Sequence, residues 1–149
     1  EKLRGDEIVS RRLPGTHAFH SHMLAPLREP LVELVKGFEL RAPQIPYLSN
    51  LTGDWVTEAE ATDPSYWARH TVETVRFAPG LAKLLAEEGR IFLEVGPGQS
   101  LGSFVLQHPA AQQLRDKLTL PSLRNRYEKQ ADEAFFLTTL GKLWLAGAL

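Results

Sequence analysis

The chain has 149 residues, enough for one ordinary domain with a sizeable core, and 43% of them are apolar, which indicates a globular protein. Its formal net charge is -1 and it has no basic block or stripe, so the composition argues against a nucleic-acid partner and against a membrane surface. The absence of cysteine excludes disulfides, thiolate nucleophiles and cysteine metal sites, and it suits a reducing cytoplasm.

The first half of the chain is predicted to contain a short strand at 8–13, an amphipathic helix at 23–38, a strand at 44–50 and a helix at 65–74. Pro26 fits the first turn of the first helix, whereas Pro30 requires a kink or a later start, because proline inside a helix lacks the N–H group. Asp63 and Pro64 predict the start of the second helix, as an N-cap acid followed by proline at the first helical position.

The second half is predicted to continue with a helix that contains Leu81 and Leu85 and stops at Gly89. A strand at 91–95, a helix at 100–107, a short strand at 118–120 and an amphipathic helix at 131–148 follow. Because strands alternate with helices, the sequence predicts an α/β fold with a parallel sheet. The chain begins without Met and ends on an apolar leucine, which suggests that both ends are cuts in a longer polypeptide.

Ser100 stands in the run Gly98-Gln99-Ser100-Leu101-Gly102, a match to the G-x-S-x-G nucleophile pattern between a strand and a helix. A self-contained serine hydrolase would need a later histidine, and only His108 follows, on or just past the same helix. The alternative is a structural turn in which the Ser100 hydroxyl caps free N–H groups at the helix start. The missing base favours the structural turn.

Three histidines, His17, His20 and His22, fall within six residues. We expect no metal there, because the segment offers neither an acid nor a cysteine as a further ligand. A near-neutral acid–base group at the edge of a cleft and a partly buried structural histidine are the two interpretations that remain open. The Gly96–Gly98 turn also looks like a phosphate cradle, but it lacks the lysine of a P-loop.

Five segments together resemble the acyltransferase domain of modular type I polyketide synthases, in the family's order and at its spacing. They are HAFHSHM (17–23), IPYLSNLTGDWV (45–56), DPSYWARHTVETVRFAPGL (63–81), FLEVGPGQSLGSF (92–104) and LPSLR (120–124). The chain is similar, more distantly, to the malonyl-CoA:acyl-carrier-protein transacylases of fatty acid synthesis. The resemblance covers nearly the whole chain.

The resemblance implies the C-terminal part of an α/β-hydrolase-like acyltransferase core that carries a ferredoxin-like small subdomain. Residues 1–16 would end that subdomain, 17–117 would belong to the core, and 118–149 would form the linker that follows the domain. The family's serine nucleophile lies in an upstream G-H-S-x-G motif, which these 149 residues do not contain. We therefore expect the isolated fragment to be inactive, and Ser100 not to be the nucleophile.

The same resemblance implies roles for individual residues. His20 would be the general base toward the upstream serine, and the backbone carbonyl of His70 would orient it in place of a carboxylate. HAFH resembles the signature of malonyl-selecting domains, which makes His17, Phe19 and Ser21 candidates for substrate specificity. Phe19 would fill the space that a C2 methyl group needs, a preference of about 1–3 kcal/mol.

The implied reaction transfers a malonyl extender unit from coenzyme A to the phosphopantetheine thiol of an acyl carrier protein, through a serine ester. Malonyl-CoA would be the substrate, and the chain itself would bind no cofactor. The implied partners are the carrier protein, the upstream acyltransferase half and a ketosynthase domain, in the cytoplasm. A non-catalytic module that docks a neighbouring domain through Phe135, Phe136 and Trp144 is the remaining alternative.

Overall fold

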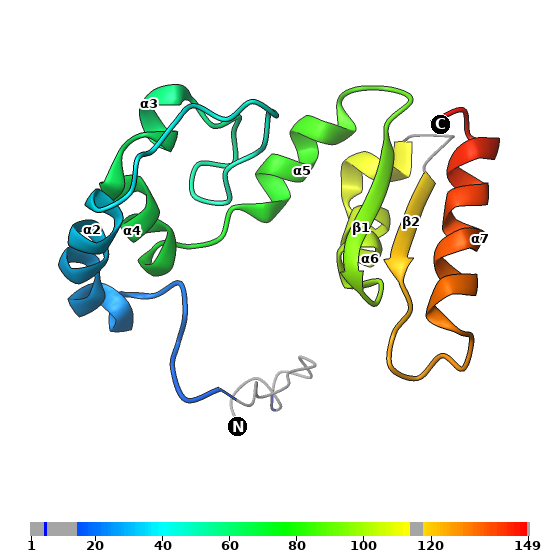
Figure 1. Cartoon of the computed structure of the whole chain (residues 1–149), viewed down its shortest axis with the longest axis horizontal. Helices are drawn as coiled ribbons and strands as arrows, with labels where there is room; N and C mark the ends of the chain where they lie inside the picture. The colour runs from blue at the N-terminus through cyan, green and yellow to red at the C-terminus, as the bar shows by residue number, and fades with distance from the viewer. Residues whose placement is uncertain (1–4, 6–14, 114–117, 149) are drawn as a thin grey trace. The chain divides into compact units, whose positions relative to one another are not determined.

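The computed structural model describes residues 5, 15–113 and 118–148, so the strand predicted at 8–13 lies outside the described residues. The chain divides into two compact units (Figure 1). The helical unit contains the residues up to Tyr47 together with Val56–Val75, and the sheet unit contains Leu48–Trp55 and Arg76–Leu149. Within the described residues, no helix is long and apolar enough to cross a membrane.

The described residues of the helical unit form a 3-10 helix and three α-helices, namely η1 (His22–Leu27), α2 (Arg28–Lys36), α3 (Glu58–Ala61) and α4 (Pro64–Val72). The helix predicted at 23–38 is thus divided, with Pro26 inside η1 and Pro30 in the first turn of α2. In a first turn the N–H that proline lacks has no helical partner to lose, which explains the late start of the α-helix. α2 packs against α4, and the two lie side by side in Figure 1.

α4 begins as the sequence predicts and ends two residues earlier. Asp63 accepts a hydrogen bond from the Ser65 N–H at 2.8 Å, and Pro64 is the first helical residue. Hydrogen bonds from the Ser65 hydroxyl and then from the Ser65 N–H lower the pKa of the Asp63 carboxyl. The helix ends at Val72, so the carbonyl groups of its last turn lack helical partners and can accept hydrogen bonds from elsewhere.

Where the structure describes the sheet unit, it shows two strands, three α-helices and a 3-10 helix, namely α5 (Phe77–Leu85), β1 (Ile91–Pro97), α6 (Ser100–Gln107), η2 (Pro109–Gln113), β2 (Leu118–Leu123) and α7 (Asp132–Leu145). β1 and β2 pair in parallel, with Ile91 opposite Leu118 and Leu93 opposite Leu120. The prediction of an α/β fold with a parallel sheet is therefore confirmed. α6 contacts both strands, and α7 lies along β2 (Figure 1).

The strand predicted at 44–50 is wrong. Leu48 makes only an isolated antiparallel bridge to Trp55, because the chain turns back on itself directly after Asn50. The buried Ser49 holds this turn: its hydroxyl accepts hydrogen bonds from the N–H groups of Leu51 and Thr52 at 3.0 and 3.2 Å. A chain reversal this tight leaves no room for a strand of seven residues.

The core of the sheet unit lies between α5, α6 and η2. Leu81, Leu85, Val105 and Ala111 are buried together, and partly buried aromatic side chains, Phe77 and Phe92, pack against them. Burial of a leucine-sized side chain stabilises a fold by about 1.5–3 kcal/mol, so this cluster carries much of the unit's stability.

α7 is fixed to the sheet by a buried hydroxyl. Thr139 is only 4% exposed, and its Oγ1 donates a hydrogen bond to the backbone carbonyl of Pro121 in β2 at 2.7 Å. The neighbouring Thr138 is exposed and donates instead to the carbonyl of Ala134, inside its own helix, also at 2.7 Å.

We expect Thr139→Val to lower the free energy of unfolding by about 1–2 kcal/mol, because the Pro121 carbonyl loses its buried partner while the side-chain volume is unchanged. Thr138→Val is the matched control and should change it by less than about 0.5 kcal/mol. Chemical unfolding of both variants tests this. Equal effects would mean that the bond to Pro121 does not fix α7.

Candidate functional site

His20 lies at the end of α4, held by two consecutive backbone carbonyl groups. Its Nδ1 is 3.0 Å from the carbonyl oxygen of His70, and its own N–H donates to the carbonyl oxygen of Thr71 at 3.1 Å. Both acceptors belong to the last turn of α4, and because the helix ends at Val72 neither carbonyl has a partner within the helix. The end of the helix therefore fixes both the backbone and the ring of His20.

The contact with His70 determines which ring nitrogen carries the proton. A carbonyl oxygen can only accept, so Nδ1 of His20 must be the donor, and in the neutral ring Nε2 keeps its lone pair. The residue is exposed within the helical unit. The arrangement is that of an oriented proton acceptor.

The backbone of His20 is in the left-handed region, with φ of 57°. Among the described residues it is the only non-glycine with positive φ. Such a conformation costs about 1–3 kcal/mol and persists where the surroundings enforce it, commonly at functional sites. Here the two bonds to the carbonyl groups of His70 and Thr71 enforce it.

Two rings complete the surroundings of His20. The ring of His70 approaches it edge-on with 6.1 Å between centroids, and the ring of Tyr66 lies 6.5 Å from that of His70. Tyr66 is buried, at 3% exposure. Sequence reasoning named His70 and missed Thr71 and Tyr66. The signal for Thr71 was the end of α4, which the prediction placed two residues too late.

The other predicted residues share the loop of His20. Nδ1 of His17 lies 2.8 Å from Oγ1 of Thr16, and the Phe19 side chain is 72% exposed. The hydroxyl of Ser21 is bonded within the loop itself. Searching the described residues finds no group of three or more histidine, aspartate or glutamate side chains that could hold a metal ion.

Ser100 does not have the geometry of an activated nucleophile. It is the first residue of α6, exposed, and free of the positive φ that marks His20. His108, the base that a hydrolase would need, accepts a hydrogen bond at Nδ1 from the N–H of Ala110 at 3.2 Å, at the start of η2. The His108 ring thus caps the start of η2. This contact does not support His108 as the base that the serine hydrolase hypothesis requires.

The start of α6 is capped by an acid rather than by Ser100. Oε2 of Glu94, on β1, accepts from the N–H of Gly102 at 2.9 Å. A carboxylate at this helix start stabilises the helix and repels other anions. The Gly96–Gly98 turn is therefore unsuited to phosphate, and the phosphate-cradle interpretation is not supported.

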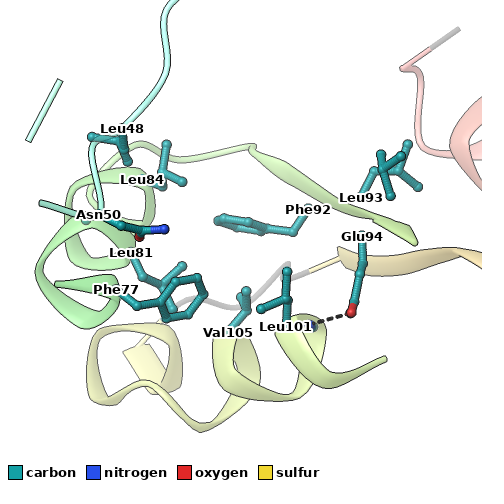
Figure 2. A pocket seen from close by; sticks show the side chains of 13 residues that line it. Leu48, Asn50, Phe77, Leu81, Leu84, Phe92, Leu93, Glu94, Leu101 and Val105 are labelled. Carbon is teal, nitrogen blue, oxygen red and sulfur yellow. Dashed lines mark hydrogen bonds between the residues drawn. The ribbon is translucent and has the colours of Figure 1, made fainter. Parts of the chain in front are cut away.

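An apolar pocket of about 370 Å³ lies in the sheet unit between α5, β1 and α6. Figure 2 shows the ring of Phe92 between the side chains of α5 and those of α6, and the hydrogen bond that Glu94 accepts from the N–H of Gly102, another residue of the lining. The lining is hydrocarbon apart from Asn50 and Glu94. The pocket holds no pair of groups suited to acid–base or nucleophilic chemistry.

The fold and the site together define an α/β protein with a histidine oriented for proton transfer. A family model described as "Acyl transferase domain" matches residues 1–148, and the chain belongs to this family. Over 147 residues it is 37% identical to a component of the phenolphthiocerol/phthiocerol polyketide synthase of Mycobacterium tuberculosis, across 99% of this chain and 10% of that protein.

Solved acyltransferase domains have the same fold. The domain of SpnD, in complex with 2-(pent-4-yn-1-yl)malonyl, aligns with a TM-score of 0.91 and 38% identity over 99% of this chain and 35% of that one. The domain from the second module of the salinomycin polyketide synthase aligns with a TM-score of 0.84 and 31% identity, over 99% of this chain and 33% of that one. The chain thus spans about a third of these domains and a tenth of the curated relative.

The left-handed backbone at His20 predicts different stabilities for two substitutions that both remove the imidazole. Asparagine tolerates positive φ better than alanine does, so His20→Asn should be more stable than His20→Ala by several tenths to about 1 kcal/mol. Thermal and chemical unfolding of the two variants measure the difference. An alanine variant at least as stable as the asparagine one would contradict the enforced conformation.

Proposed function

We propose that this chain is part of a polyketide synthase acyltransferase domain in which His20 is the general base. The observation that carries the proposal is the 3.0 Å contact between Nδ1 of His20 and the carbonyl oxygen of His70. It leaves Nε2 free for proton transfer, and it supplies the orienting acceptor that other bases take from a carboxylate. Membership of the acyl transferase domain family supports acyl transfer as the reaction in which this base would act.

In the first half of the reaction, Nε2 of His20 takes the proton of a serine hydroxyl as its oxygen attacks the thioester carbonyl of malonyl-CoA. The coenzyme A thiolate leaves and takes that proton from the imidazolium, which leaves a malonyl-serine ester. In the second half, Nε2 takes the proton of the phosphopantetheine thiol, whose sulfur attacks the ester. The serine oxygen leaves and recovers the proton, so both halves return His20 to its neutral form.

The serine would come from another part of the synthase. The 149 residues contain no G-H-S-x-G motif, and Nδ1 of His108, the one histidine that follows the exposed Ser100, accepts a hydrogen bond from the N–H of Ala110. In this proposal residues 1–16 end a ferredoxin-like subdomain, 17–117 belong to an α/β-hydrolase-like core and 118–149 form the linker that follows it. The fragment alone binds no cofactor and transfers no acyl group.

The partners are the acyl carrier protein, the upstream acyltransferase half and a ketosynthase domain. The exposed apolar side chains of α7 support a packing role for the linker in the whole synthase: Phe136 is 44% exposed and Trp144 67%. Relatives named as polyketide synthases support the multidomain setting. The SpnD domain, bound to a substituted malonyl group, supports a malonyl-type acyl group.

Replacing His20 in the complete domain tests the base. His20→Gln should lower the rate of malonyl transfer to the carrier protein by about 10²–10⁴-fold, the usual contribution of a general base. His22→Gln is the matched control, because His22 is an exposed histidine two residues further along the chain, at the start of η1, and it should keep the wild-type rate. A His20→Gln enzyme with the wild-type rate, or a malonyl adduct on Ser100 of the isolated chain, would overturn the proposal.

We further propose that Phe19 and His17 favour malonyl over methylmalonyl, with the Phe19 ring beside the base filling the space of a C2 methyl. In the complete domain, Phe19→Ser combined with His17→Tyr should raise the methylmalonyl-to-malonyl ratio of kcat/KM by roughly 5- to 150-fold, the worth of one methyl group. Competition between the two coenzyme A esters measures this ratio. An unchanged ratio would place the selectivity elsewhere.

A further inference from the structure

The loop that carries His20 is closed on itself by the hydroxyl of Ser21. This hydroxyl donates to the carbonyl oxygen of Ala18 at 2.7 Å and accepts from the N–H of Met23 at 3.3 Å. Ser21 is also the N-cap of η1, and its carbonyl oxygen accepts from the N–H of Leu24 at 3.1 Å. The hydroxyl therefore joins the residues before His20 to the helix that follows it.

The bonds of Ser21 and those of α4 both restrain the segment that contains His20. The carbonyl groups of His70 and Thr71 hold the ring and the N–H of His20 from outside the loop. Ser21 fixes the loop from within, because the chain from Ala18 to Met23 cannot extend while both bonds to its hydroxyl persist. Left-handed backbone at a residue other than glycine needs such enforcement.

We infer that Ser21 is a positioning residue for His20, and not a residue that selects the acyl group. The Ser21 hydroxyl donates its proton to the carbonyl oxygen of Ala18, and one of its lone pairs accepts from the N–H of Met23. These bonds stabilise the loop, so the hydroxyl is not available to donate to a substrate. This inference rests on the proposed function, in which His20 is the base. It predicts that Ser21 affects the rate of proton transfer, whereas the family resemblance of the HAFH segment implies that Ser21 contributes to substrate specificity.

The test uses the complete acyltransferase domain with malonyl-CoA and its carrier protein. Ser21→Ala should lower kcat by about tenfold, since a misplaced base loses rate, and should leave the KM for malonyl-CoA within about twofold. Ser21→Thr should restore most of kcat, because it keeps the hydroxyl and because the extended backbone of Ser21, with φ of -142° and ψ of 166°, accepts a β-branched residue.

Ser103→Ala is the matched control. The Ser103 hydroxyl also donates to a backbone carbonyl, that of Gln99 at 2.8 Å, but it lies in the sheet unit. Its loss should leave both kcat and the unfolding midpoint close to those of the wild type, because the bond lies within an exposed turn of its own helix. Measuring kcat of Ser21→Ala well below its unfolding midpoint, together with the recovery expected in Ser21→Thr, separates a loss of positioning from a general loss of stability.

Three results would overturn the inference: a wild-type kcat for Ser21→Ala, a Ser21→Thr variant no better than Ser21→Ala, or a changed methylmalonyl-to-malonyl ratio with kcat unchanged. The His20→Gln variant, measured in parallel, separates this failure from that of the proposed function. If His20→Gln is inactive while Ser21→Ala is normal, only the role of Ser21 is wrong. If His20→Gln is active, the base itself is misassigned.

Discussion

The hydrogen bond between Nδ1 of His20 and the carbonyl oxygen of His70 is the interaction on which the site depends. It exists because α4 stops at Val72, which leaves the carbonyl groups of its last turn without helical partners. A helix continued to residue 74, as the sequence pattern suggests, would use the His70 carbonyl for its own ladder. The position of the helix end thus decides whether the imidazole has an orienting acceptor.

This arrangement would allow the proposed base to work without a carboxylate. An aspartate beside a histidine supplies a full negative charge, whereas a helix end supplies a partial charge of about half an electron together with a fixed direction. The neutral carbonyl cannot take up the proton, so the proton on Nδ1 stays there throughout. Strain at the backbone of His20 is the energetic cost, offset by bonds from two sides of the loop.

Local signals made much of the fold predictable. Asp63 and Pro64 mark the start of α4, and α6 begins at Ser100 as predicted, although β1 continues through Gly96 and Pro97, the first two residues of the predicted turn. The strand predicted at 44–50 fails because an apolar run does not reveal that Ser49 closes a turn. The short helix α3 was missed although its capping box, Thr57 with Glu60, can be read from the sequence.

The candidate site was less accessible to sequence reasoning. No pattern of spacing links His20 to His70, because their bond joins a side chain to a backbone atom fifty residues away. Only the resemblance to a family suggested that pair. The positive φ of His20 and the hydroxyl bonds of Ser21 have no sequence signal, since both arise from how the loop meets η1 and α4. Conversely, the sequence around Ser100 matches a catalytic motif, yet in the structure this segment is an ordinary helix start capped by Glu94.

The most direct test of the account is the tautomer of His20. Nitrogen-15 NMR of the complete domain labelled at its histidine ring nitrogens, with His20 assigned by comparison with His20→Asn, measures which nitrogen carries the proton when the ring is neutral. The account predicts protonated Nδ1 and unprotonated Nε2. A ring with its proton on Nε2 would contradict it, because such a histidine could neither donate to the His70 carbonyl nor take a proton at Nε2.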